Sequence, residues 1–257
     1  MNLVHALSET WTLTTRMFRH NLRSPDTIMT VLVMPVMIML LFVFVLGGAM
    51  NTGQARYIDY VVPVVLLLCI ASGIAYTTLR VNQDVSTGMF ARLHTMPIAR
   101  SALVGGHIVA SVVVNAVSMA VVWLVALLCG YRSHAGLEGW LVSLGLLALA
   151  LVAFSVMGVA FGVTARSAEG GGMYAYLLMG LMFVSSGFAP TETMSSGLRA
   201  FADHQPMTPI IDAIRDAQQL GHPTGSDGWV AVAWLVAITV VFAVVARVGG
   251  RGVATRL

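Results

Sequence analysis

Charged side chains that could recognise another molecule are concentrated in one short stretch of an otherwise apolar half-chain. Residues 80–106, RVNQDVSTGMFARLHTMPIARSALVGG, connect two long segments that contain no Asp, Glu, Lys or Arg, residues 61–79 and 102–130. The stretch is long enough to form a short helix of its own, which Pro97 would end. The stretch is therefore a candidate for a segment that recognises another molecule.

Two faces of this short helix differ in chemistry. One face carries Val85, Met89 and Leu93, and the other carries Asp84, Gly88 and Arg92, each set at intervals of four residues. A helix with a soft apolar face and a charged edge, held between two rigid segments, is suited to docking in a groove of a partner protein. An ordinary solvated loop is the alternative, and the residues alone leave both readings open.

Side chains that could carry enzyme chemistry do not form a recognisable set. All 14 basic residues are arginine, so the chain has no lysine for a Walker A loop or for a Schiff base. There is no H-E-x-x-H and no G-x-S-x-G motif, and the seven histidines are scattered along the chain. We expect that the chain is not an enzyme and that it binds no metal and no cofactor of its own.

The composition places these residues in a membrane protein. The chain is 58% hydrophobic and 10% charged, whereas soluble domains are about 25% charged. The charged side chains are too few to cover the surface of a globular protein in water. We therefore expect lipid to surround much of the chain. We predict an all-α integral membrane protein that forms a single domain, residues 1–257, without a cleavable signal peptide.

Six apolar segments approach or exceed the roughly 20 residues that a membrane-spanning helix needs. They are residues 27–48, 61–79, 102–130, 140–165, 170–190 and 228–246. Residues 2–24 precede them as a basic helix with one apolar stripe, which favours an interfacial helix over one packed on a soluble partner. Residues 191–227 hold several prolines and an apolar periodicity, which favour two short helices at the membrane surface over a plain loop.

The arginines predict the orientation of the six spans. An even number of spans places both termini on one side, and ten arginines fall on that side against four on the other. We therefore expect both termini and the loop of residues 80–106 in the cytoplasm. Seven acidic residues fall on the outer side: Asp59, Glu138, Glu192, Asp203, Asp212, Asp216 and Asp227.

The interiors of the predicted spans are nearly free of ionisable groups. Ion-coupled carriers keep such groups near the middle of the membrane, so their scarcity argues against a carrier. Asn115 lies deep in the third predicted span. Its side chain could form a hydrogen bond to a neighbouring helix, which is the common role of asparagine in membrane helices. Contact with a transported molecule is the more specific alternative. Glycines such as Gly158 and Gly162 have the spacing that allows close helix packing.

Three blocks of sequence carry a more specific signal than the composition does. The first is D-V-S-T-G-M-F-A-R-L-H-T-M-P-I-A-R, residues 84–100, which resembles the first cytoplasmic loop of ABC-2 type transporter permeases, particularly the daunorubicin-resistance branch. The second is S-S-G-F-A-P, residues 185–190, followed by Met194 and Leu198. The third is H-Q-P-M-T-P, residues 204–209, followed by D-A-I-R, residues 212–215. Their order and the six-span plan extend the resemblance over nearly the whole chain.

The resemblance implies roles for particular residues. The first block would be a coupling helix that meets a separate nucleotide-binding ATPase subunit, through Asp84, Gly88, Met89, Arg92, Leu93, Pro97 and Arg100. The last two blocks would close the pathway outside the cell, through Ser186, Phe188, Pro190, Pro206, Asp212 and Arg215. Asn115 stays a candidate for the pathway.

The resemblance also implies partners and a location. The chain would be the permease subunit of an ATP-driven exporter in a bacterial plasma membrane. A second permease chain, identical or a paralogue, would complete it, and ATP with Mg²⁺ would bind the partner subunit. Amphipathic drugs or lipid-like molecules would enter from the bilayer, and no nucleic acid would bind. An ion-coupled carrier and a non-transporting scaffold remain the alternatives.

Overall fold

The computed structural model describes residues 28–49, 56–87, 100–165 and 167–254, and within them the chain forms helices and no strand. The predicted interfacial helix of residues 2–24 and most of the predicted coupling helix lie outside the described residues. Helices suit a membrane because each one satisfies its backbone hydrogen bonds within itself, where no water is present.

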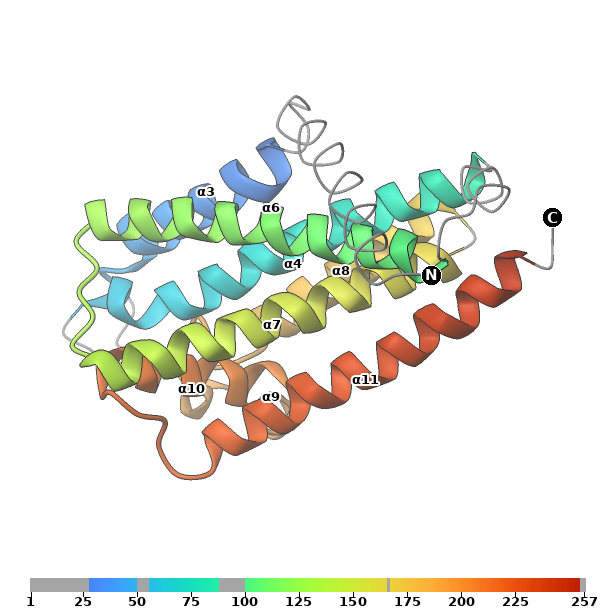
Figure 1. Cartoon of the computed structure of the whole chain (residues 1–257). Helices are drawn as coiled ribbons and strands as arrows, with labels where there is room; N and C mark the ends of the chain where they lie inside the picture. Colours follow the sequence, from blue (N-terminus) through green and yellow to red (C-terminus); the bar gives the residue numbers. More distant parts are fainter. Residues whose placement is uncertain (1–27, 50–55, 88–99, 166, 255–257) are drawn as a thin grey trace.

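Five long apolar helical stretches dominate the fold (Figure 1). The first, Met29–Leu46, is a continuous series of a π-helix η1 (Met29–Val33), an α-helix α3 (Met34–Leu40) and a second π-helix η2 (Leu41–Leu46). The others are α4 (Tyr57–Ser86), α6 (Arg100–Leu128), α7 (Leu137–Thr164) and α11 (Asp227–Ala254). Each is long and apolar enough to cross a membrane, and together they confirm a multi-pass membrane protein.

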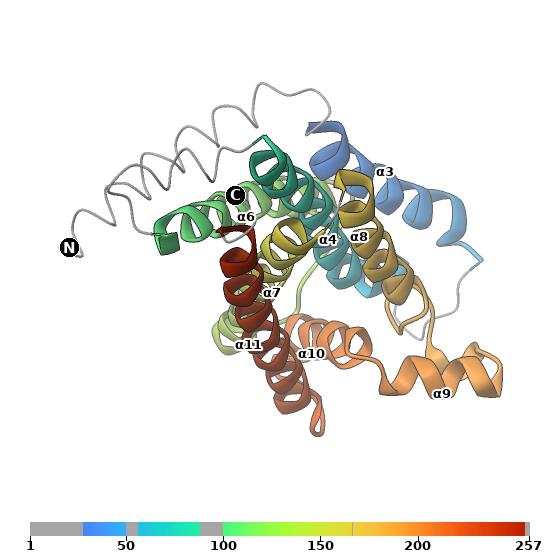
Figure 2. The ribbon, with the colours of Figure 1, turned by 90° about the vertical axis from the view of Figure 1, so that its right-hand side faces the viewer.

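One predicted span differs from the others. The segment predicted as residues 170–190 is helical only over α8 (Ala168–Phe183), whose 16 residues extend about 24 Å. That is less than the roughly 30 Å of a hydrocarbon core. A short 3₁₀ turn η3 (Thr191–Thr193) and two predicted short helices follow, α9 (Ser196–His204) and α10 (Met207–Gln219). Figure 2 shows α9 extending away from the bundle.

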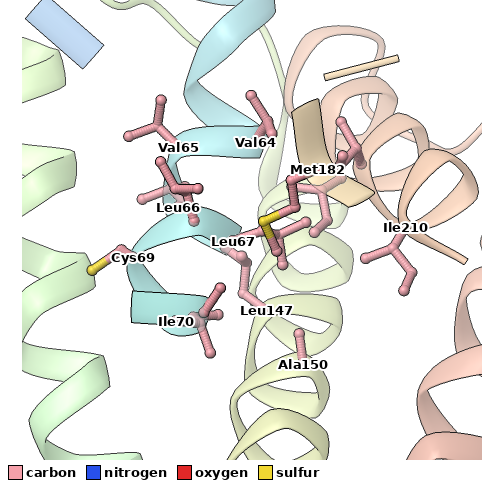
Figure 3. Close-up of a cluster of buried hydrophobic side chains, with 14 of the residues drawn as sticks. Val64, Val65, Leu66, Leu67, Cys69, Ile70, Leu147, Ala150, Met182 and Ile210 are labelled. Carbon is pink, nitrogen blue, oxygen red and sulfur yellow. The ribbon is translucent and has the colours of Figure 1, made fainter. Parts of the chain in front are cut away.

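The helix α4 is the centre of the molecule and is buried along nearly its whole length. α3, α6, α7, α8 and α10 all pack against it. Figure 3 shows the resulting core, in which Leu67 and Ile70 of α4 lie near Leu147 of α7, Met182 of α8 and Ile210 of α10. α4 is therefore in contact with most of the other described helices. A movement of α4 would change its packing against each of these helices.

Small residues bring α7 and α8 close to α4, as the glycine spacing predicted. A Cβ atom on Gly162 would lie 2.5 Å from Val81 Cβ, and one on Gly171 would lie 2.6 Å from Thr78 Cγ2. The close approach lets Thr78 Oγ1 donate to the Gly158 carbonyl (3.0 Å) and Asn82 Nδ2 to the Ala165 carbonyl (2.8 Å). Neutral side chains thus join these helices in the way expected of membrane bundles.

The chain crosses the bundle in alternating directions, which gives the bundle two chemically different ends. At the acidic end, where α4 and α11 begin and α6 ends, lie four arginines and all seven acidic residues predicted to share one side. Here Gly130, with φ of 97°, ends α6 in a tight turn, in which Tyr131 N donates to the Ala126 carbonyl. The basic end holds Arg80, Arg100, Arg247 and Arg251, with Asp84 and Glu169.

The helix α4 is longer than the segment predicted as the second span. α4 begins at Tyr57 rather than Val61 and continues to Ser86 rather than Leu79, and no proline or glycine lies between Leu79 and Thr87 to end the helix earlier. Arg80 and Asp84 therefore lie on the last turns of α4 and not in a separate loop. Likewise Tyr57, Asp59 and Tyr60 belong to its first turn.

Candidate functional site

The segment after α8, residues 184–190, leaves helical geometry while four of its residues, 185–188, remain buried. Backbone carbonyls in such a place need hydrogen-bond donors from elsewhere in the protein. Tyr60 Oη donates to the Ser186 carbonyl (2.5 Å), and Tyr57 Oη donates to the Phe188 carbonyl (2.8 Å). Arg215 Nη2 also donates to the Ser186 carbonyl (2.8 Å). We call Tyr57, Tyr60, Ser186, Asp212 and Arg215 the Arg215 cluster.

Arg215 is the hub of this cluster, and only 6% of it is exposed. Its Nη1 donates to Asp212 Oδ1 at 2.5 Å, and its Nε donates to the Tyr60 carbonyl at 3.1 Å. Burial of a guanidinium is tolerated here because each of its three nitrogens has a partner. α10 presents this arginine because Ile210, Ile211 and Ile214 anchor the same helix in the core.

Asp212 joins the cluster to the irregular segment. Ser186 Oγ donates to Asp212 Oδ1 at 2.7 Å, so one carboxylate oxygen binds both Ser186 and Arg215. Burial raises the pKa of Asp212 above its usual value, and the Arg215 charge and the Ser186 hydroxyl oppose that rise. The cluster is thus a compact ion pair whose charges are largely withdrawn from water.

The turn between α9 and α10 supports the same segment. Gln205 Nε2 donates to the carbonyls of Leu181 (2.9 Å) and Val184 (3.2 Å), and so closes the open end of α8. Pro206 is the N-cap residue that immediately precedes α10, and Pro190 likewise precedes η3. Phe188 packs on Phe42 of η2 at a ring distance of 4.3 Å. All six residues predicted for the outer gate therefore lie in or beside this assembly.

A second set of polar contacts secures the acidic end. The Asp59 carboxylate pairs with Arg56 (2.9 Å) and accepts from Arg132 N (3.0 Å). Tyr131 Oη donates to Gln218 Oε1 (2.8 Å), whose amide nitrogen donates to Ser143 Oγ (2.9 Å). These bonds fix the turn after α6 against α10 and α7.

Sequence reasoning missed Tyr57, Tyr60 and Gln205. The two tyrosines were assigned to a loop because the second span was started at Val61. Their spacing of three residues, next to an apolar run, was the signal that could have placed them on one face of the first turn of α4. Gln205 lies inside the H-Q-P-M-T-P block, but nothing in the sequence indicated that its amide would close another helix.

At the basic end, the structure locates two of the residues predicted for coupling. Asp84 Oδ2 lies 3.3 Å from His107 Nε2, so the end of α4 contacts the start of α6. Arg100 is the first residue of α6. The other five, Gly88, Met89, Arg92, Leu93 and Pro97, lie outside the described residues. The pair Asp84–His107 therefore joins the two helices on either side of the predicted coupling helix.

Asn115, the predicted pathway residue, lies in the seam between α4 and α6 and is 1% exposed. Its Nδ2 donates to the Ser111 carbonyl (2.9 Å), and a Cβ on Gly73 would collide with its amide group. Asn115 Oδ1 has no hydrogen-bond partner among the described residues. Asn115 thus packs against Gly73 of α4, but its hydrogen bonds to Ser111 stay within α6, so neither the interhelical hydrogen bond nor the pathway role is established for it.

Among the residues that the structure describes, no group of three His, Cys, Asp or Glu side chains could hold a metal ion. The interactions within the Arg215 cluster are an ion pair and hydrogen bonds to carbonyls.

Comparison with known proteins gives consistent matches. Residues 8–218 match the sequence profile of the ABC-2 type transporter family. Over 195 residues, 75% of this chain and 68% of the relative, the sequence is 29% identical to the daunorubicin resistance ABC transporter permease protein DrrB1 of Streptomyces coeruleorubidus. Over 251 residues, 97% of this chain and 90% of the relative, it is 24% identical to the probable doxorubicin resistance ABC transporter permease protein DrrC of Mycobacterium tuberculosis.

Proposed function

Because the chain belongs to the ABC-2 type transporter family, we propose that it is the membrane-spanning permease subunit of an ATP-driven exporter. Its substrate is an amphipathic drug or a lipid-like molecule, and the drug class is supported by the two relatives, which are named for resistance to daunorubicin and doxorubicin. A separate ATPase subunit supplies the energy. ATP and Mg²⁺ bind that subunit, because this chain has no lysine with which to build a Walker A loop.

The observation that carries the proposal, beyond the family match, is the distribution of buried polar groups. The buried polar side chains along the middle of the described spans are hydroxyls and amides, among them Ser72, Thr78, Ser111 and Asn115. The buried Asp, Arg and His side chains among the described residues lie near the ends of the bundle, with Asp59 and Arg215 at the acidic end and His107, which contacts Asp84, at the basic end. A proton- or sodium-coupled carrier needs ionisable groups within the spans, so this distribution favours an ATP-driven permease.

The charge difference between the two ends supports an orientation. Arginine is enriched on the cytoplasmic side of membrane proteins, so the basic end faces the cytoplasm and the acidic end faces outward. The segment that follows α4 then meets the ATPase subunit, and residues 184–190 with the Arg215 cluster close the pathway on the outside. A second permease chain, identical or a paralogue, pairs with this one to complete the transporter.

In this scheme ATP draws the motor subunits together, and the coupling segment moves with them. The movement passes to α4 and α6, which the Asp84–His107 pair joins at the basic end. α4 carries it to the acidic end, where its first turn holds the closing segment. Export follows when that closure opens.

The deciding experiment isolates the tagged chain from its host in mild detergent and reconstitutes the complex in vesicles. We expect a stoichiometric ATPase to co-purify and a fluorescent cationic amphipath to accumulate in inside-out vesicles only with ATP. A matched complex, with the Walker lysine of the ATPase replaced, should bind and not transport. Arg92→Ala and Gly88→Leu should leave the chain inserted but reduce the coupling.

Two outcomes would contradict the proposal. Transport driven by a proton gradient in vesicles that contain no ATPase would identify an ion-coupled carrier. A chain purified alone, without ATP hydrolysis, under conditions in which control ABC complexes survive would favour a scaffold role.

A further inference from the structure

The closing segment, residues 184–190, is attached to α4 through its backbone rather than through its side chains. The carbonyls of Ser186 and Phe188 accept from Tyr60 and Tyr57, both on the first turn of α4. A carbonyl that loses such a donor in an apolar place finds no water to replace it. The two hydroxyls are therefore the donors by which α4 itself holds this segment, while Arg215 of α10 donates to the Ser186 carbonyl as well.

The two tyrosines act as a unit because they lie three residues apart on one helical face, with ring centres 6.2 Å apart. Both are buried, with exposed fractions of 7% for Tyr57 and 5% for Tyr60. Arg215 covers the Tyr60 ring at 3.8 Å and donates to the same Ser186 carbonyl as the Tyr60 hydroxyl. Tyr60, Arg215 and the Ser186 carbonyl thus each contact the other two.

Pro63 separates this first turn from the rest of α4. A proline inside a helix cannot donate to the carbonyl four residues earlier, which here is that of Asp59. Gln219 Nε2 approaches that carbonyl at 3.5 Å, and Arg215 Nε donates to the carbonyl of Tyr60 at 3.1 Å. Side chains of α10 therefore bind the backbone carbonyls of the first turn of α4, within residues 57–62. This turn lies next to Pro63, and proline is a position at which helices bend readily.

We propose that Tyr57 and Tyr60 are positioning residues of the outer closure, whose hydroxyls hold residues 184–190 against the first turn of α4. When that turn tilts at Pro63, both bonds break together and the segment is released. The transport consequence rests on the proposed function, whereas the attachment itself can be measured on this chain alone.

The test uses the full chain in lipid nanodiscs, with Cys69 and Cys129 replaced by alanine and Ala189→Cys as a reporter in the closing segment. The rate of labelling by a charged, membrane-impermeant maleimide measures how often the segment opens. Tyr57→Phe and Tyr60→Phe each remove one hydroxyl and keep the ring. The net strength of a buried hydrogen bond corresponds to about a fivefold change in an equilibrium, so we expect about fivefold faster labelling for each variant.

The matched control is Tyr131→Phe, because Tyr131 is also buried at the acidic end but donates to Gln218 and not to the closing segment. Its labelling rate should equal that of the parent. The inference is overturned if the variants Tyr57→Phe and Tyr60→Phe label within twofold of the parent. Equal acceleration in Tyr131→Phe would also overturn it, since general loosening would then explain the effect.

The combined variant Tyr57→Phe/Tyr60→Phe should be labelled faster than either single variant. If the combined variant fails to insert into the membrane, the twofold threshold for the labelling rates of the single variants still decides the test. The labelling test requires no ATPase. It can therefore succeed or fail independently of the proposed exporter function. Faster labelling without any ATP-dependent transport by the parent complex would reject only the exporter assignment.

Discussion

The guanidinium of Arg215 lies 3.8 Å from the centre of the Tyr60 ring, and its Nε donates to the backbone carbonyl of the same residue. One side chain of α10 therefore binds both the aromatic face and the backbone of α4. The same guanidinium reaches the Ser186 carbonyl, and so three elements that are far apart in the sequence meet at one cation. Arg215 therefore links α4, α10 and the segment of residues 184–190 at the acidic end.

Arg215→Ala should be strongly destabilising. It leaves the half-buried Asp212 carboxylate without its cation and removes donors from the carbonyls of Tyr60 and Ser186. Breaking a fully buried pair costs about 3–5 kcal/mol, and we expect a loss near the lower end of that range. The yield of monodisperse protein after stepwise heating in detergent measures the effect. Arg199→Ala is the control, because its ion pair with Asp203 is largely exposed and should contribute less than about 1 kcal/mol. Equal heat resistance of both variants would contradict this prediction.

Arg215→Lys tests geometry separately from charge. A lysine keeps the positive charge near Asp212 but replaces a planar fork by a single ammonium group. It cannot donate in parallel to Tyr60, Ser186 and Asp212 as the guanidinium does. We expect a stability between those of the parent and Arg215→Ala, measured by the same heating series. A lysine variant as stable as the parent would indicate that charge alone suffices.

The ionisation of Asp212 should make the stability depend on pH. Because burial raises its pKa in the folded chain, the folded state takes up this proton at a higher pH than the unfolded state does. The folded state therefore binds more protons between the usual value near 3.8 and the raised value, and stability increases as the pH falls through that window. Asp212→Asn should remove this part of the pH dependence.

The measurement is the apparent Tm at a series of pH values between about 4 and 7, a range that brackets an ordinary carboxyl pKa. Asp203→Asn is the matched control, since Asp203 is an exposed carboxylate on α9, and its profile should follow that of the parent. If Asp212→Asn follows the parent as well, another group must account for the acid dependence.

The sequence predicted the spans well because their length and apolar content are local properties. Residues 102–130 and 140–165 correspond closely to α6 and α7, and residues 228–246 lie within the longer helix α11. The glycines also behaved as expected, because a missing side chain permits close packing whichever helix approaches. Residues 170–190 differ because apolarity does not reveal where a helix stops, and α8 ends at Phe183 while the apolar run continues.

The candidate site was predictable only in part. Family resemblance indicated Ser186, Asp212 and Arg215, and the structure places these three within hydrogen-bonding distance of one another. Nothing local to Tyr57 or Tyr60 reveals that their hydroxyls meet carbonyls more than 120 residues away. Such pairings depend on the tertiary arrangement, which one sequence without its three-dimensional context does not contain.

Close packing of α7 on α4 should make Gly162 intolerant of any side chain. A Cβ at this position would lie 2.5 Å from Val81 Cβ and 2.9 Å from the Thr78 carbonyl oxygen. Gly162→Ala should therefore cost about 1–3 kcal/mol through overpacking. Gly145→Ala on the same helix is the control, because nothing lies within 4 Å of its Cβ position, and it should be neutral or slightly stabilising. Heat resistance in detergent distinguishes the two, and equal losses would contradict the packing.

The Asp84–His107 pair should control coupling between the ATPase and transport. Asp84 Oδ2 lies 3.3 Å from His107 Nε2, and only 6% of the His107 side chain is exposed, so the contact is shielded from water. Asp84→Ala separates α4 from α6 at the end where the proposed coupling segment begins. A hydrogen bond to a charged group corresponds to about a tenfold change in an equilibrium. We expect the reconstituted complex to retain ATP hydrolysis while the substrate moved per ATP falls by up to this factor.

Two further variants separate coupling from simple loss of structure. Gln83→Ala, at an exposed position beside Asp84, should transport as the parent does. Exchange of the pair, Asp84→His with His107→Asp, restores opposite partners and should recover part of the coupling that each single variant loses. If the exchanged variant is no better than the worse single variant, the contact does not carry the signal. Unaltered coupling in Asp84→Ala would mean that movement reaches α4 entirely through the backbone at Ser86.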